Sequence, residues 1–155
     1  IEYKVTSDDQ LVIKQARPWV SFWADVKANS DLGITEFLTP QSSSSLGSNE
    51  LVTVRIANTG LNDMDDFEIS LFVDDQLVQT MPINETIEPF SDADFQFTIP
   101  QDFSTIGDYN LTGVVSHIDD EYVNNDTLNY ILSKVQVLDG SLSIVELAVV
   151  CYVEV

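Results

Sequence analysis

The fold class is decided by the stretch Val52-Thr-Val-Arg-Ile-Ala-Asn-Thr-Gly60 and by the run after it, Phe67-Glu-Ile-Ser-Leu-Phe-Val-Asp74. In both runs apolar residues occupy every second position, which places them on one face of a β-strand and the polar residues on the other. Between the runs, Asn58-Thr59-Gly60 supplies residues that tolerate positive φ, so the chain is expected to reverse there. The pattern predicts an antiparallel β-domain that buries one face of each strand.

Further segments carry strand-like patterns and are separated by turn signals. They are residues 32–37, 76–81, 93–99, 107–117 and 127–137. Together with the first two runs they make about seven short strands at the spacing of a β-sandwich, and no segment shows a sustained helical period. We therefore predict an all-β antiparallel sandwich with a tight reversal at Asp74-Asp75 and a tyrosine corner at Gly107-Asp-Tyr109. The residues predicted to face the core are Val52, Val54, Ile56, Ile69, Leu71, Phe97, Tyr109, Leu111 and Val115.

The 155-residue chain divides into three parts. Residues 1–30 hold four of the six basic residues and both tryptophans, residues 31–139 form the predicted sandwich, and residues 140–155 are a second strand-like extension. Isolated apolar strands aggregate, so the terminal segments are expected to pair with the sandwich, with each other or across chains. The alternative is that they are remnants of neighbouring domains. A first residue other than Met favours a segment of a longer precursor.

The charge of the chain limits its partners. It holds 26 acidic and 6 basic side chains, a formal net charge of −20, which repels phosphate backbones and anionic lipid. Nucleic acid and membrane insertion are therefore not expected, whereas cations and basic partners are. The most apolar stretch, residues 145–153, contains Glu146 and is too short to span a bilayer.

Oxygen-bearing side chains gather between the last two predicted strands. Hard oxygen ligands in a loop suit calcium, which is the cofactor we consider. The spacing lacks the pattern of an EF-hand loop, so a solvated acidic loop is the alternative, and residues 62–66 form a second candidate loop. Whether the two loops share one end of the sandwich stays open. The proposed calcium ligands are Asp119, Asp120, Glu121, Asn124 and Asp126.

Catalytic chemistry finds little support in the sequence. His117 is the only histidine, and Cys151 lies in an apolar run that suits a small buried side chain better than a reactive thiolate. No phosphate-binding loop, zinc spacing or serine elbow is present, so we predict that the chain is not an enzyme. Trp19 and Trp23, with Phe22, are either an aromatic platform for carbohydrate or a packing surface against the sandwich or a preceding domain.

Several motifs stand in the order found in CARDB-like domains, the cell-adhesion-related domains of bacteria. They are Asp31-Leu-Gly-Ile-Thr35, Leu51 to Gly60, Phe67 to Val73, Gly107-Asp-Tyr109 and Asn124-Asn-Asp-Thr127. The resemblance covers about residues 31–137 and is strongest to versions in secreted and surface proteins of Bacteroidetes. Residues 1–30 and 140–155 have no counterpart in it, and the turn before Phe67 lacks the usual small residues.

The resemblance implies a non-catalytic, immunoglobulin-like sandwich that serves as a spacer or adhesion module in a larger secreted or cell-surface protein. Its partners would be other domains or chains of a surface assembly, or a carbohydrate or protein ligand. The alternative function is a calcium- or carbohydrate-binding accessory module. Asp126-Thr127-Leu128 also resembles the O-glycan acceptor motif that Bacteroidetes use, which would make Thr127 a glycosylation site.

Overall fold

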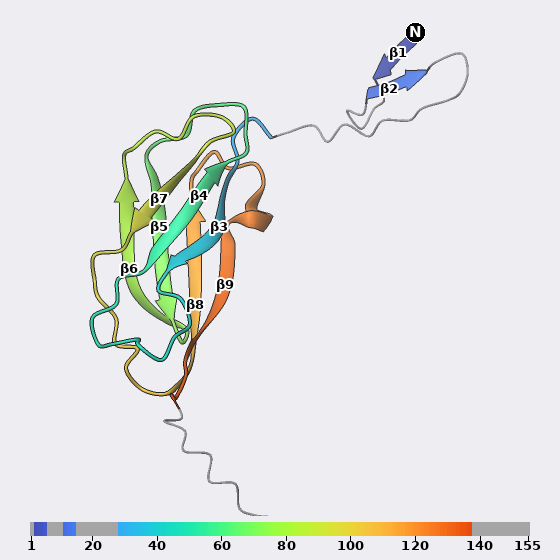
Figure 1. The fold of residues 1–155 in the computed structure, drawn as a ribbon. Coiled ribbons are helices and arrows are strands. Elements are labelled where there is room, and N and C mark those ends of the chain that lie inside the picture. The colour runs from blue at the N-terminus through green and yellow to red at the C-terminus, as the bar shows by residue number, and fades with distance from the viewer. Residues whose placement is uncertain (1, 6–10, 15–27, 138–155) are drawn as a thin grey trace, which may run out of the picture.

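Residues 28–137 fold into two antiparallel β-sheets packed face to face. The computed structural model describes residues 2–5, 11–14 and 28–137 (Figure 1). One sheet has the order β3-β4-β7, with β3 at Leu32–Thr39, β4 at Thr53–Asn58 and β7 at Asp92–Gln96. The other has the order β6-β5-β8-β9, with β5 at Phe67–Val73, β6 at Gln76–Ile83, β8 at Gly107–Ser116 and β9 at Thr127–Lys134. The predicted sandwich of about seven strands is confirmed.

Two shorter strands precede the sandwich. The strand β1, Glu2–Val5, pairs antiparallel with β2, Leu11–Lys14. The segment 140–155, for which a further strand was predicted, lies outside the described residues.

The two runs that predicted the fold do not pair with each other. β4 pairs with β3 and β7, whereas β5 pairs with β6 and β8 in the opposite sheet. The reversal after β4 therefore carries the chain from one sheet to the other and is not a hairpin. The hairpin is the next connection, where Asp74 and Asp75 both have positive φ, at 48° and 64°, as a two-residue turn between twisted strands requires.

The turn Asn58-Thr59-Gly60 does not adopt the positive φ angles that we expected from its sequence. In the described part of the chain positive φ occurs at Asp66, Asp74, Asp75, Phe90 and Gly107, and at none of these three residues. Gly60 is required for close packing instead, because a Cβ there would lie 2.7 Å from the carbonyl oxygen of Asn29 and 2.8 Å from the amide of Asp31. The missing side chain lets the turn lie against the segment that leads into β3.

Asn58 organises the loops around this turn. Its side chain is fully buried, and its Nδ2 donates to the carbonyl oxygens of Asn62 and Ile87, each at 2.8 Å. Its Oδ1 accepts from the amide of Gly60 at 3.0 Å. A buried amide is tolerated only with such partners, so Asn58 pins the β4–β5 connection to the β6–β7 connection.

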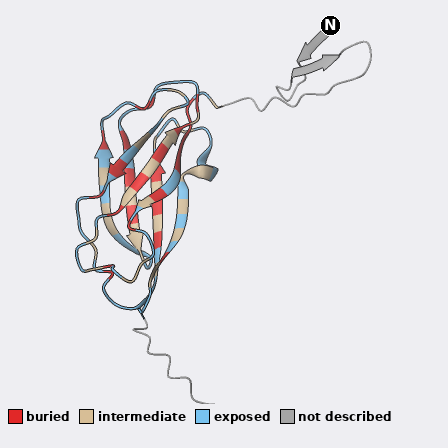
Figure 2. Cartoon of the chain, in the orientation of Figure 1, coloured by how far each residue is buried: buried red, intermediate tan, exposed pale blue. Residues whose placement is uncertain are grey.

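The core lies between the sheets and is formed by the alternating residues of both (Figure 2). Eight of the nine predicted core residues are buried, and the ninth, Tyr109, is half-buried and packs against the core. The hydroxyl of Tyr109 donates a hydrogen bond to the carbonyl of Thr105 at 2.9 Å. Its ring packs edge-to-face against that of Phe103, with the two ring centroids 4.9 Å apart. This is the predicted tyrosine corner.

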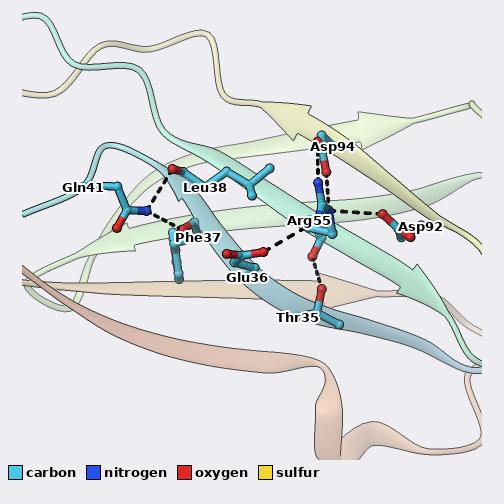
Figure 3. A network of polar contacts seen from close by, with 8 residues as sticks. All are labelled: Thr35, Glu36, Phe37, Leu38, Gln41, Arg55, Asp92 and Asp94. Atoms are coloured by element: carbon cyan, nitrogen blue, oxygen red, sulfur yellow. Dashed lines mark hydrogen bonds and ion pairs between the residues drawn. The ribbon is translucent and has the colours of Figure 1, made fainter.

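The outer face of the β3-β4-β7 sheet carries an ion-pair cluster around Arg55 (Figure 3). Arg55 Nε and an Nη atom bind Asp94 at 2.7 and 3.0 Å, and Nε lies 3.1 Å from Asp92 on the same strand. Glu36 on β3 lies 3.7 Å from the other Nη. The guanidinium therefore joins all three strands across their solvent face. Its hydrogen bond to Asp94, together with its positive charge, holds the pKa of that carboxyl below its usual range.

Lys134 fixes a loop at the end of the sandwich where β9 finishes. Its Nζ donates to the carbonyl oxygens of Ser44 at 2.5 Å and Leu46 at 2.6 Å. Ser43 adds two backbone hydrogen bonds, donating to Ser133 and accepting from Val135. We call this the lower end, defined by residues 41–47 and 133–135 and drawn lowest in Figure 1.

Candidate functional site

The predicted oxygen-rich loop lies at the opposite end, where the chain enters β3. We call this the upper end, defined by residues 29–32, 59–62 and 117–126 (Figure 1). The amide of Glu121 donates to the carbonyl of Ser30 at 2.9 Å. Its carboxylate accepts from the amide of Asn29 at 2.9 Å and from the Asn29 side chain at 3.2 Å. The loop thus holds the segment that leads into the first strand of the sandwich.

Asp120 uses both carboxylate oxygens in the same region. Oδ2 accepts from the amide of Leu32 at 2.8 Å, and Oδ1 accepts from the amide of Tyr122 at 2.8 Å. The first bond joins the loop to β3, and the second bends the loop into the short 3₁₀ turn η1, Val123–Asn125. Asp120 therefore has a structural task, whether or not it also binds a cation.

Asp31 and Asn125 complete this cluster, and neither was among the predicted ligands. Asp31 is only 8% exposed, and its carboxylate accepts from Asn125 Nδ2 at 2.8 Å and from Thr59 Oγ1 at 2.5 Å. Asn125 rests on Gly33, where a Cβ would lie 2.5 Å from Asn125 Nδ2. The pair is 94 residues apart in sequence, so no local spacing could have revealed it.

Asp126 occupies the least favourable electrostatic position at the upper end. Burial, with the negative charges of Asp120 and Asp31, raises its pKa from 3.8 to about 6. Its Oδ1 is buried without a hydrogen-bond partner, and so is Oδ1 of Asn125. Two orphaned oxygens beside two further carboxylates form an electron-rich position that favours a proton or a cation.

The other proposed ligands lie on the surface. Asp119 and Asn124 are exposed. The second candidate loop is at the same end, because the amides of Leu61 and Asn62 both donate to the carbonyl of Asn29 at 2.8 Å. Within residues 28–137 no three histidine, cysteine or acidic side chains are already arranged to hold a metal ion.

His117 lies at the upper end of the sandwich. It follows β8, is half-buried, and its Nδ1 accepts from the amide of Asp119 at 3.1 Å. An open cavity of about 530 Å³ lies between the edge strands β6 and β7, with Met81, Ile83 and Phe95 in its lining, and His117 does not line it. The histidine and this cavity therefore do not form one site.

Two predicted sites remain, the glycosylation site and the carbohydrate platform. Thr127 is exposed as the first residue of β9, so its hydroxyl is accessible to a modifying enzyme, and its glycosylation stays a prediction. Trp19 and Trp23, the predicted carbohydrate platform, lie outside the described residues.

The fold is shared with solved structures that include domains from two archaeal organisms named below. The chain is 22% identical to a solution structure of residues 272–376 of a candidate cell surface protein from Methanosarcina acetivorans, with a TM-score of 0.57, covering 69% of this chain and 93% of that one. It is 15% identical to a solution structure of the CARDB domain of a Pyrococcus furiosus protein, with a TM-score of 0.53 and coverage of 68% and 95%. A crystal structure of that domain in complex with di-metal ions gives 16% identity, a TM-score of 0.54 and coverage of 67% and 92%.

Three further findings bear on the identity of the chain. No curated protein matches the chain significantly, and no helix in the described residues has the length and hydropathy to cross a membrane. The CARDB family profile matches residues 29–130, which span the chain from its entrance into β3 to the middle of β9. With more than half of its length matched, the chain belongs to the CARDB family.

Proposed function

We propose that this chain is a non-catalytic spacer or adhesion module of a larger secreted or cell-surface bacterial protein. The observation that carries the proposal is the CARDB match over residues 29–130, a family of non-catalytic domains, together with a structural relative described as a candidate cell surface protein. An origin in Bacteroidetes is part of the proposal and rests on the sequence resemblance alone.

The arrangement of the two ends supports a spacer. The chain enters β3 at the upper end and leaves β9 at the lower end, so consecutive modules would follow one another along the long axis of the sandwich (Figure 1). Both ends are tied down, the upper by Asp120 and Glu121 and the lower by Lys134. Entry and exit at opposite ends are what a spacer in a row of modules requires.

Surface location is tested by protease treatment of intact cells that produce the full precursor. An antibody against the sandwich should label intact cells, and protease should remove the label while a cytoplasmic protein in the same cells survives. A sandwich that becomes accessible only after lysis would contradict the proposal. Beads coated with the chain then separate the two roles, because an adhesion module binds immobilised glycans or matrix proteins and a spacer does not.

Calcium binding at the upper end is a second candidate function. The specific observation in its favour is the pair of buried, unpartnered oxygens, Asp126 Oδ1 and Asn125 Oδ1, beside Asp31 and Asp120. The donor set consists of oxygen atoms, as calcium requires, and the structural relative from Pyrococcus furiosus is described in complex with di-metal ions. Since these side chains are not preassembled around a metal position, a bound cation would need the loop 119–126 to adjust.

Melting in millimolar calcium tests this candidate. A cation that binds only the folded state raises the melting temperature, and its effect amounts to about 2.7 kcal/mol at one hundred times the dissociation constant. The shift should vanish in Asp126→Asn, persist in Thr127→Val, and weaken below pH 6, where Asp126 is protonated. If calcium raises the melting temperature of wild type no more than sodium does at equal ionic strength, the calcium proposal is wrong. The spacer proposal is unaffected by that result.

A further inference from the structure

One side of the sandwich is open between its two sheets. The strands on this side are β6 and β7, which are the last strands of their sheets and do not pair with each other (Figure 1). On the other side the sheets are bridged, because Ser43, which follows β3, pairs with Lys134 at the end of β9. The open side contains the cavity of about 530 Å³, whose lining includes Met81, Ile83 and Phe95. An unpaired strand edge beside apolar side chains can accept an extended segment of another chain.

The side chain of Gln79 on β6 closes one end of this side. Its Nε2 donates to Oγ1 of Thr98 at 2.9 Å, and its Oε1 accepts from the amides of Thr98 at 3.0 Å and Ile99 at 3.2 Å. These bonds join β6 to the segment that follows β7. The cavity is lined by β7 itself, through Asp94, Phe95 and Gln96. The space for an occupant therefore lies beside β7.

The backbone of β7 has hydrogen-bonding groups on its outer edge. At one end of the β4–β7 ladder the amide of Phe97 donates to the carbonyl of Val52, and at the other end the amide of Asn58 donates to the carbonyl of Ser91, each at 2.9 Å. Hydrogen-bonded pairs alternate with non-hydrogen-bonded pairs in an antiparallel ladder. Every second residue of β7 therefore turns its backbone N–H and C=O groups away from β4. These residues are Asp92, Asp94 and Gln96.

The side chains of β7 define which sequence would fit against this edge. Ala93 and Phe95 pack toward the core, whereas Asp92 and Asp94 are exposed on the solvent face. In a strand added to β7, residues beside Ala93 and Phe95 point between the sheets, and the residues that alternate with them point to the solvent face. The added strand therefore needs apolar residues at every second position and partners for carboxylates at the others.

The charges on this side favour a basic partner. The guanidinium of Arg55 contacts three carboxylates, those of Glu36, Asp92 and Asp94. One positive and three negative charges leave this cluster with a net charge of −2, and Glu85 in the cavity lining adds another negative charge. Among the described residues that line the cavity, none is basic. A second copy of this chain would bring the same carboxylates and a net charge of −20, so copies repel each other, whereas a basic segment is attracted.

We propose that the open side of the sandwich binds an extended, basic segment of another protein, which adds to β7 as a further strand. The backbone of the segment pairs with the outward groups of Asp94 and Gln96, and its apolar side chains enter the cavity beside Phe95. Its lysine or arginine side chains lie beside Asp92 and Asp94. Pro82 makes β6 the poorer edge, since proline has no N–H to donate. This inference goes beyond the spacer or adhesion role and holds whether or not the module is a spacer.

Fluorescence anisotropy with labelled peptides tests the proposal on the full chain. The probe is a peptide of about nine residues in which lysine alternates with valine, the pattern that an added strand requires. A second peptide has serine in place of every valine and so keeps the charge without the apolar side chains. We expect the valine peptide to bind about tenfold more tightly or better, because burying even one valine side chain contributes roughly that factor. Equal affinities, or no binding of the valine peptide, would overturn the proposal.

The variant Gln96→Pro tests pairing with the backbone of β7. Gln96 is exposed at the end of an edge strand, where proline is tolerated, and the substitution removes an N–H that points away from β4. Loss of one backbone hydrogen bond should weaken binding of the valine peptide about fivefold. The matched control, Gln96→Ala, loses the same side chain, keeps the N–H and should bind like wild type. Equal affinities of the two variants would count against pairing along β7.

Amide exchange in the wild-type chain gives a readout that needs no variant. The bound valine peptide should slow exchange at Asp94 and Gln96 and leave Phe95 unchanged, because the amide of Phe95 already lies in the β4–β7 ladder. Unchanged exchange at Asp94 and Gln96 in saturating peptide would overturn the proposal. Protection of these two amides that rises with protein concentration in the absence of peptide would also overturn it, because a second copy would then occupy the edge.

Discussion

At each end of the sandwich a charged side chain holds the backbone of a loop in place, and the charges at the two ends have opposite sign. At the upper end carboxylates accept hydrogen bonds from backbone amides, as Asp120 does from Leu32 and Glu121 does from Asn29. At the lower end the ammonium of Lys134 donates to the carbonyls of Ser44 and Leu46. At the upper end, burial and the negative charges of Asp120 and Asp31 raise the pKa of Asp126, whereas the lower end places one cation among backbone carbonyls. The comparison shows that a loop can be held by a negatively or a positively charged side chain. We expect only the acidic upper end to respond to protons and cations.

The strongest perturbation of the upper end should come from Asn58→Ala. The substitution removes three side-chain hydrogen bonds, of which the one to the carbonyl of Ile87 is buried and the one to the carbonyl of Asn62 is partly buried. At about 1 kcal/mol for each bond, the free energy of unfolding should fall by about 3 kcal/mol. Urea denaturation measures this loss, with the exposed Asn124→Ala as its control. Equal midpoints for the two variants would show that Asn58 does not pin the loops.

A smaller loss is expected at the lower end from Lys134→Met, which keeps the length of the side chain and removes its charge. Two hydrogen bonds from a charged donor in a partly solvated position should be worth about 1–2 kcal/mol. Amide exchange at Ser43 and Val135 should accelerate while exchange at Leu32 and Tyr122 stays slow. Gln136→Met, an exposed neighbour, is the control. Faster exchange at both ends would mean that the ends are not independent.

The pH dependence of stability should separate the ends further. Because the pKa of Asp126 is raised from 3.8 to about 6 in the folded state, the folded protein binds this proton more tightly than the unfolded chain. The stabilisation is complete below pH 3.8 and is lost as the pH rises through about 6. Subtracting the Asp126→Asn stability curve from that of wild type should reveal this decline between pH 4 and pH 7. The same subtraction with the neutral variant Asn124→Ala should give a flat line, and a flat line for Asp126→Asn would contradict the assignment.

The smallest effect concerns the charges that act on Asp126. Removing the charge of Asp120 in Asp120→Asn should lower the pKa of Asp126 toward its ordinary value, since this charge contributes to the rise together with burial and Asp31. Nuclear magnetic resonance titration of the Asp126 carboxyl carbon measures the change. Asp119→Asn should leave the titration in place, because Asp119 is exposed and is not among the charges that raise this pKa. An unmoved pKa in Asp120→Asn would assign the rise to burial and Asp31.

Strand positions and the core were predictable because both follow from short-range patterns. Alternation along β4 and β5 marked the buried residues, and Gly107-Asp-Tyr109 marked the tyrosine corner that the Thr105 hydrogen bond confirms. The role of Gly60 was predicted wrongly, since a glycine in a turn suggests positive φ and its actual constraint is contact with Asn29. Backbone approach between distant segments leaves no signature in local sequence.

The sequence by itself determined the all-β class, the acidity and the residues that face the core, because side-chain periodicity and composition are local properties. Tertiary structure decided which strands pair, with β4 and β5 in separate sheets, and which side chains meet at the upper end. Asp31 and Asn125 are 94 residues apart and touch only because the sheets stack. Partners at that distance depend on how sheets pack and loops close, which no short pattern encodes.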